Sequence, residues 1–288
     1  MSKKIGSIIQ SFLYTLSYPL AQLLGGIIYT LIATVWIIVA SNSADTLISS
    51  FDLLKKNIVL ISAFSSAILL LVYAIIYGFR GAVPKKLFNL KRISLGKAAV
   101  SVFAGLSVYN LVVLVLGLLA ILLPQFTQSL EQHNQLLQPL FDNVWISILC
   151  VGIFMPVLEE LFFRGIILRV LKKHLRPVWF ILISAVMFGL VHMNITSFNL
   201  LQPAYAFLIG VVLAILCHRF DSILAPIFAH IAFNLSSAVL TFFIEPLSAQ
   251  NQAVEIILSS VLILSSLLAP LAIFLIYRLS RKETTVLE

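Results

Sequence analysis

Two adjacent carboxylates, Glu159 and Glu160, lie inside a long apolar segment of this 288-residue chain. A charged side chain at the centre of a membrane-spanning helix costs about 3 kcal/mol or more, so it marks a functional site by default. Arg164 follows Glu160 at i, i+4, which places the two on one helical face and predicts an ion pair. Glu159 is turned by about 100° from Glu160. We therefore expect Glu159 to face a different neighbour and to remain available for chemistry.

Two later apolar segments carry further polar pairs at the same spacing. Phe188 and His192 form one pair, and His230 and Asn234 form the other. A carboxylate in a poorly solvated site can take a proton from water, and a histidine can share that task or bind a metal. A second histidine and an amide can donate hydrogen bonds to the oxyanion that develops on a scissile carbonyl. The set therefore suits hydrolysis.

A covalent nucleophile is not indicated by the sequence. There is no Gly-x-Ser-x-Gly motif, and neither Cys150 nor Cys217 has a base near it in sequence. Both cysteines fall in apolar segments without a metal-binding spacing, so we expect free thiols. We also expect no catalytic role for the remaining histidines, which are His133, His174 and His218. Activated water is the favoured nucleophile.

Each of these residues also has a purely structural interpretation. Glu160 and Arg164 can be a structural ion pair alone, and a single histidine on an apolar helix is often only a packing residue. Asn234 can simply form a hydrogen bond to a neighbouring helix. The joint occurrence of the three pairs is the stronger indication.

The composition predicts an all-α, polytopic transmembrane bundle of about eight helices. The chain is 61% hydrophobic and 10% charged, whereas soluble domains carry about 25% charged residues. The net charge of +8 does not indicate nucleic-acid binding, because the charges cluster between apolar runs. Runs long enough to span a bilayer occur at about 19–40, 58–79, 98–123, 145–170, 177–195, 201–217, 222–244 and 256–277. We expect residues 1–18 to be an interfacial lead-in.

The distribution of Lys and Arg predicts the orientation. The 80–97 loop holds six of them, and the 171–176 turn holds three, whereas the loops at 124–144, 194–200 and 245–255 hold none. Because cytoplasmic loops carry the excess of Lys and Arg, both termini are predicted to be cytoplasmic. Helix-rise estimates place Glu159, His192 and His230 at compatible depths, and we expect a wet cavity that opens toward the cytoplasm. Residues 41–44 resemble a signal-peptide cleavage site, but the long apolar run before them favours a retained first helix.

The three motifs resemble those of the CAAX-processing and bacteriocin-processing (CPBP, or Abi) intramembrane endopeptidases. The matching positions are Glu159-Glu160-x-x-x-Arg164, Phe188-x-x-x-His192 and His230-x-x-x-Asn234. The resemblance covers roughly 145–245. It implies that Glu159 activates water with His192, that His230 and Asn234 stabilise the oxyanion, and that Glu160, Arg164 and Phe188 organise the site.

The resemblance leaves the metal question open. It allows a zinc ion on Glu159, His192 and His230, and it equally allows a metal-free glutamate mechanism. A catalytic zinc site needs three protein ligands and a water, but the compact His-Glu-x-x-His form is missing.

The expected function is that of an intramembrane endopeptidase, embedded as a multi-pass protein in the cell membrane. Its expected partners are the bilayer and a peptide or protein substrate with a hydrophobic or membrane-associated segment, prenylated or bacteriocin-like, and not nucleic acid. Two other functions remain open: a non-proteolytic scaffold or immunity protein, and a proton-coupled transporter. We expect one integrated membrane domain with scaffold helices at 1–144, a protease core at 145–245, and a last helix with a cytoplasmic tail at 246–288.

Overall fold

The computed structural model describes residues 2–41, 46–79, 88–193, 199–248 and 251–284, and over these residues it contains helices and no strand. Seven helices are long and apolar enough to cross a membrane, and one shorter apolar helix accompanies them. The prediction of an all-α polytopic bundle is confirmed. The protein is an integral, multi-pass membrane protein.

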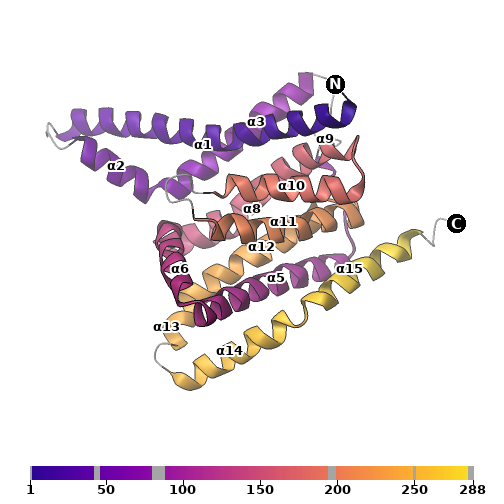
Figure 1. Ribbon diagram of the computed structural model, residues 1–288. Coiled ribbons are helices and arrows are strands. Elements are labelled where there is room, and N and C mark those ends of the chain that lie inside the picture. The colour runs from indigo at the N-terminus through magenta and orange to yellow at the C-terminus, as the bar shows by residue number, and fades with distance from the viewer. Residues whose placement is uncertain (1, 42–45, 80–87, 194–198, 249–250, 285–288) are drawn as a thin grey trace.

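The first helices form a layer of their own on one side of the bundle (Figure 1). They are α1 (Lys3–Ser41), α2 (Thr46–Lys56) and α3 (Ile58–Phe79). Helix α1 begins at Lys3 and runs without a break through Pro19, so the lead-in predicted at 1–18 and the run predicted at 19–40 form one helix. Residues 42–45, which include most of the cleavage-site-like motif, lie outside the described residues.

The next elements lead into the functional segment. Helix α5 (Leu95–Leu122) spans, and α6 (Pro124–Leu137) is a short helix that lies across the end of the bundle (Figure 1), followed by the 3₁₀ turn η1 (Gln138–Phe141). A continuous apolar rod then runs from Val144 to Lys172. It consists of α7 (Val144–Ile146), η2 (Ser147–Phe154), α8 (Met155–Phe162), η3 (Phe163–Ile167) and α9 (Leu168–Lys172). Both η2 and η3 are π-helical, a form that appears frequently at functional sites.

The remaining helices complete the bundle. They are α10 (Pro177–Val191), α11 (Leu201–Phe220), α12 (Leu224–Val239), the π-helical η4 (Leu240–Ile244), α13 (Glu245–Ser248), α14 (Gln252–Ser266) and α15 (Ala269–Thr284). The run predicted at 177–195 ends at Val191, four residues early. The last predicted helix is divided in two by a turn at Leu267 and Leu268.

The best-packed part of the bundle surrounds the π-helical segment η3. Phe162, Phe163, Ile166 and Ile167 are almost fully buried, as is Phe188 of α10. By contrast, many apolar side chains of α1, α3 and α14 are exposed in the isolated chain, as is expected of surfaces that face lipid. The interior therefore holds the 159–167 region rigidly, while the outer helices present the apolar surface.

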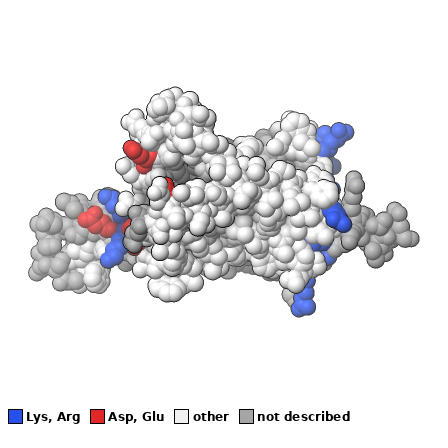
Figure 2. All heavy atoms as spheres, turned by 90° about the horizontal axis from the view of Figure 1, so that it is seen from below, with Lys and Arg blue, Asp and Glu red and all other residues white. Residues whose placement is uncertain are grey.

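Charge separates the two ends of the bundle. Figure 2 shows Lys and Arg at the end that carries α9 and both termini, whereas Asp and Glu gather at the opposite end, where Lys55 and Lys56 also lie. The described acidic residues at this opposite end include Glu131 on α6, Asp142 beside η1 and Glu245 on α13. We refer to the two as the basic end and the acidic end.

Candidate active site

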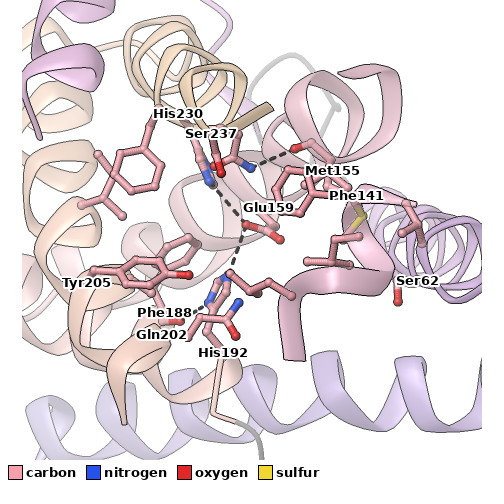
Figure 3. Close-up of a pocket in the computed structure, with 18 residues that line it drawn as sticks. Ser62, Phe141, Met155, Glu159, Phe188, His192, Gln202, Tyr205, His230 and Ser237 are labelled. Carbon is pink, nitrogen blue, oxygen red and sulfur yellow. Dashed lines mark hydrogen bonds and ion pairs between the residues drawn. The ribbon is translucent and has the colours of Figure 1, made fainter. Parts of the chain in front are cut away.

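A cavity of about 230 Å³ lies inside the bundle, and the predicted site residues line it (Figure 3). Glu159, His192, His230, Asn234 and Phe188 all contribute to its wall. They come from three elements that are far apart in sequence, α8, the end of α10 and α12. The structure therefore brings the three sequence motifs together in one place.

The predicted ion pair between Glu160 and Arg164 is present and is completely enclosed. Arg164 Nη1 lies 2.9 Å from Glu160 Oε1, and both side chains are inaccessible to solvent. Arg164 Nη2 also donates to the backbone carbonyl of Gly210 on α11, at 3.0 Å. A buried ion pair needs such additional hydrogen bonds to offset the cost of desolvation. The pair thus ties α8 and η3 to α11.

His230 is held by the same carboxylate. Its Nδ1 lies 3.0 Å from Glu160 Oε1, and the residue is 3% exposed. An ionised carboxylate only accepts hydrogen bonds, so Nδ1 carries the proton and donates it to Glu160. In a neutral imidazole the other nitrogen, Nε2, then presents a lone pair, and this atom lies 3.8 Å from Glu159 Oε2.

His192 is oriented in the same way by a different acceptor. It caps the C-terminus of α10, and its Nδ1 lies 2.8 Å from the backbone carbonyl of Phe188. A carbonyl oxygen cannot donate, so His192 Nδ1 also carries the proton and leaves Nε2 as the acceptor. Nε2 of His192 lies 3.9 Å from Glu159 Oε2. Two imidazole nitrogens of matched tautomer therefore face one carboxylate oxygen (Figure 3).

The early end of α10 explains this placement of His192. In a helix that continued to residue 195, His192 would lie in the last turn, and its backbone would take part in the helical hydrogen bonds. Because the helix ends at Val191, the backbone of His192 leaves the helical geometry, with φ −91° and ψ 1°. The functional side chain therefore sits on a helix terminus within the bundle, where the next helix, α11, supplies Gln202 and Tyr205 to the cavity wall.

The other oxygen of Glu159 is contacted by a residue that the sequence analysis missed. Tyr18 of α1 donates from its hydroxyl to Glu159 Oε1, at 3.4 Å. Ser66 of α3 donates to the same hydroxyl at 3.2 Å, and Gln22 donates to Ser66 at 2.8 Å. The first helices, which were expected to be scaffold, supply a chain of hydrogen bonds that ends at the Glu159 carboxylate. The i, i+4 spacing of Tyr18 and Gln22 on an apolar helix was the available signal.

Asn234 is fixed by a backbone contact across helices. Its Nδ2 donates to the carbonyl of Val151, at 2.8 Å. Val151 belongs to the π-helical η2. The amide has two N–H groups, and this bond uses one of them. Asn234 also lines the cavity.

The aromatic ring of Phe188 packs against the basic side chains of the site. Its ring centroid lies 4.7 Å from that of His192 and 5.6 Å from that of His230. The guanidinium of Arg164 lies 4.8 Å from the same centroid, which is a cation–π distance. Phe188 is 1% exposed. It therefore contacts all the basic groups of the site and excludes water from behind them.

The arrangement does not fit a metal site of the kind that the resemblance allows. Within the described parts of the chain, no three His, Cys, Asp or Glu side chains are placed to hold a metal ion together. Glu159 Oε2 lies 3.8 Å from Nε2 of His230 and 3.9 Å from Nε2 of His192. This is wider than the separation of about 3.4 Å between tetrahedral ligands that lie about 2.0–2.1 Å from one zinc ion.

The lining of the cavity extends to the acidic end of the bundle. Leu137, Leu140 and Phe141 of the α6–η1 segment line the cavity, and so does Gln202 at the start of α11. These residues lie at the acidic end. Glu159 itself lies near the middle of its helix, about 20 Å from Lys172 and about 22 Å from Val144. The cavity thus extends from the middle of the bundle toward the end that the Lys and Arg count predicts to be outside the cytoplasm.

The remaining histidines and the cysteines are set apart from this cavity. Cys150 and Cys217 are free thiols, as expected, and are half-buried. His174 is exposed in the turn after α9, and His218 packs edge-on against Phe180. His133 of α6 is buried beside Tyr205, at 5.6 Å between ring centroids, and burial lowers the pKa of its imidazole.

Comparisons with known proteins agree with the motifs. Residues 141–236 match the family model described as Type II CAAX prenyl endopeptidase Rce1-like. The chain is 30% identical over 129 residues to a Bacillus subtilis (strain 168) protein named "Putative membrane peptidase YdiL", which is 43% of this chain and 51% of that protein. The chain thus spans about half the length of this relative. No solved structure matches the chain significantly. The resemblance to CPBP endopeptidases is confirmed.

Proposed function

We propose that this chain, a multi-pass membrane protein with an Rce1-like segment at 141–236, is an intramembrane endopeptidase that hydrolyses peptide bonds with water activated by Glu159. One observation carries the proposal. A carboxylate oxygen and two acceptor nitrogens converge, at 3.8 and 3.9 Å, on a cavity inside an apolar bundle. No role in packing requires three acceptors to face one another.

The distances suit a bridging water. Groups that are 3.8–3.9 Å apart are too far for a direct hydrogen bond, and a polar contact of this length is commonly bridged by a water molecule. A water can donate to Glu159 Oε2 and to one imidazole Nε2. Both acceptors then draw its protons away and turn its lone pair toward the substrate. His192 is the second acceptor in this scheme, since the Phe188 carbonyl fixes its tautomer.

The reaction follows from these positions. The water oxygen attacks the scissile carbonyl carbon, and Glu159 takes the proton that is released. The carbonyl oxygen becomes an oxyanion, which accepts a hydrogen bond from the second N–H of Asn234. As the C–N bond breaks, the proton held by Glu159 passes to the leaving nitrogen. The products are a carboxylic acid and an amine, and the acid proton then passes to the amine to give a carboxylate and an ammonium group.

His230 has a different role from a simple hydrogen-bond donor. Its Nδ1 proton is committed to Glu160, so Nε2 can donate to the oxyanion only when the ring is protonated. The adjacent Glu160 carboxylate stabilises that imidazolium, as a buried carboxylate does beside a catalytic histidine. Glu160 and Arg164 then act as positioning residues. Tyr18 holds the second oxygen of Glu159 and so fixes the direction of the first.

The substitution Glu159→Gln tests the proposal, because it keeps the shape of the side chain and removes its basicity. General-base removal costs about 10²–10⁴-fold in rate, and we expect a loss in this range. The measurement is the set of new peptide termini that appear in membranes of cells producing the protein, quantified by mass spectrometry. Glu255→Gln, at an exposed position of α14, is the matched control and should cleave normally.

Two results would overturn the assignment. One is full cleavage by the Glu159→Gln variant. The other is a set of new termini that is the same with and without the wild-type protein, because the chain would then act by binding or transport instead of hydrolysis. His192→Ala should resemble Glu159→Gln, whereas His174→Ala should have no effect.

A further inference from the structure

A second cavity, of about 550 Å³, lies at the basic end of the bundle and has no role in the mechanism above. Its wall is built by the first turns of α1, the end of α3, the end of α9 and the turn that follows. Figure 1 shows the start of α1 beside α9, and the two helices are in contact. The residues that line this cavity are different from those around Glu159. We call it the basic-end cavity.

Two lysines give the basic-end cavity its charge. Lys3 of α1 and Lys173, directly after α9, both line it. The helices α1, α3 and α9 contain no Asp or Glu, so they supply no counter-charge to these lysines. Asp221, an acidic residue that lines a neighbouring cavity together with Lys172, lies 3.9 Å from Lys91 instead. The basic-end cavity therefore attracts an anion from outside the protein.

Hydrogen-bond donors dominate the polar part of the wall. A lysine ammonium carries three N–H groups and no acceptor. Gln10 also lines the cavity, and its Nε2 uses one of two N–H groups in a bond of 2.7 Å to the hydroxyl of Tyr14. The hydroxyl of Ser7 belongs to the same wall and donates to the carbonyl of Lys4. A phosphate group, whose oxygens are strong acceptors, matches such a wall.

Exposed apolar side chains adjoin the basic-end cavity. On α1 they include Ile9 and Leu13, which are 43% and 59% exposed, and on α3 they include Ile76, which is 41% exposed. Leu13 lies about one turn beyond Gln10, toward the middle of the bundle. Surfaces of this kind face lipid tails. An anion between the two lysines thus lies at the end of a surface that acyl chains cover.

We propose that the basic-end cavity binds the phosphate of an anionic phospholipid, with its head between Lys3 and Lys173 and its acyl chains along α1 and α3. Basic pockets between membrane helices bind such headgroups, and 550 Å³ is in the range of about 300–1,000 Å³ typical of ligand sites. A zwitterionic head would bring a cation to helices that carry no acidic residue. The proposal does not depend on whether the chain hydrolyses peptides.

The bound lipid connects two elements that also meet at the candidate active site. Lys3 belongs to α1, and Lys173 follows the rod that carries Glu159. Further along α1, Tyr18 donates to Glu159 of the same rod. A headgroup that contacts both lysines therefore holds the first helical layer against the rod at the basic end.

Neighbouring lysines provide a matched test. The double variant Lys3→Gln/Lys173→Gln removes both charges from the cavity. The double variant Lys4→Gln/Lys172→Gln removes the same charge from the same end, at residues that do not line the cavity. All four lysines are exposed, and substitutions at exposed positions rarely change stability much. Both variants should therefore fold like the wild type, which their thermal unfolding midpoints check.

The probe is phosphatidylglycerol with a photoactivatable diazirine near its head, in vesicles that otherwise contain phosphatidylcholine. Native mass spectrometry of the purified protein measures the bound lipid, and crosslinked peptides locate it. We expect crosslinks at the start of α1, the end of α3 and residues 168–173. Because each lysine near an anionic lipid contributes about 5-fold, the affinity of Lys3→Gln/Lys173→Gln should fall by roughly 25-fold. Lys4→Gln/Lys172→Gln should keep the wild-type affinity.

Four results would overturn the proposal. Equal losses in the two double variants would mean that the overall charge of the basic end attracts the lipid. Crosslinks that avoid these segments would exclude the cavity. Equal binding of phosphatidylcholine would remove the selectivity for an anionic head, and displacement of the lipid by inorganic phosphate would leave a site for a small anion only. Glu159→Gln should bind phosphatidylglycerol like the wild type, so a failure of the proposed protease is distinguishable from a failure of this site.

Discussion

At the scale of single residues, one carboxylate connects three helices. Glu160 Oε1 accepts from Arg164 on η3 and from His230 on α12, and the arginine in turn donates to Gly210 on α11. Glu160 itself is fully buried. Its neighbour Glu159 contacts Tyr18 and faces the two histidines. The two adjacent glutamates thus have different roles. Only Glu160 is paired with a fixed cation, Arg164, whereas Glu159 faces the cavity.

The substitution Glu160→Gln tests this structural task. The change leaves Arg164 as a buried cation without its counter-charge, and breaking such a pair costs about 3–5 kcal/mol. We expect a clear fall in the thermal unfolding midpoint of the purified protein in detergent. Glu131→Gln, at an exposed position of α6, is the control and should unfold like the wild type. Equal midpoints for the two variants would contradict a stabilising role of the pair.

Much of this residue-scale picture could be predicted from the sequence. The i, i+4 spacing of Glu160 and Arg164 is a local property of a helix, and the ion pair is present. The contact of Tyr18 with Glu159 was not predictable in this way. It depends on the position of α1 relative to α8, and helix pairing leaves no spacing signal in a single sequence. The shared acceptor of Arg164 and His230 was missed for the same reason.

At the scale of elements, close approach of backbones sets where His230 lies. Helix α5 passes α12 at Gly105, where a Cβ atom would lie 2.0 Å from the carbonyl oxygen of Ala229. Ala229 is the residue before His230. Small residues permit such contacts between membrane helices. The position of the histidine thus depends on the absence of a side chain on a helix that contributes nothing else to the site around Glu159.

The substitution Gly105→Ala tests this dependence. The added methyl group must push α12 away, and a displacement of about 1 Å at a catalytic group can cost 10²-fold in rate. We expect cleavage to fall by about that factor, measured as the new peptide termini in membranes of cells that produce the protein. Gly117→Ala is the matched control on the same helix, because a Cβ there meets nothing within 4 Å. Equal activities of the two variants would show that the approach is not important for the site.

The limits of prediction at this scale lie in the helix ends. Apolar runs identify where helices are, and seven spanning helices with one shorter companion agree with eight predicted runs. The sequence did not indicate that α10 ends at Val191, since residues 192–195 continue without a Gly or Pro. Nor did it indicate the π-helical segments η2 and η3. Each of these departures adjoins a site residue, where tertiary contacts override local preference.

At the scale of the whole molecule, the two ends differ in charge and in access to the site. The basic end carries α9, both termini and the Lys and Arg seen in Figure 2, whereas residues of α6 and η1, at the acidic end, line the cavity of the candidate active site. Lys and Arg are retained on the cytoplasmic side. If both termini are cytoplasmic, as the Lys and Arg count predicts, we expect substrate access from the non-cytoplasmic side, whereas the depth estimates predict a cytoplasmic opening.

Single cysteines test this orientation. In a background with Cys150→Ala and Cys217→Ala, we introduce Glu131→Cys on α6 or Lys173→Cys after α9, both at exposed positions. A membrane-impermeant maleimide added to intact cells should label the first variant and not the second, since it reaches only the outer surface. Permeabilised cells, in which both should react, are the control for thiol reactivity. Labelling of only the Lys173→Cys variant in intact cells would show that the basic end faces outward. The acidic end would then be cytoplasmic, and the peptides would be cleaved from that side.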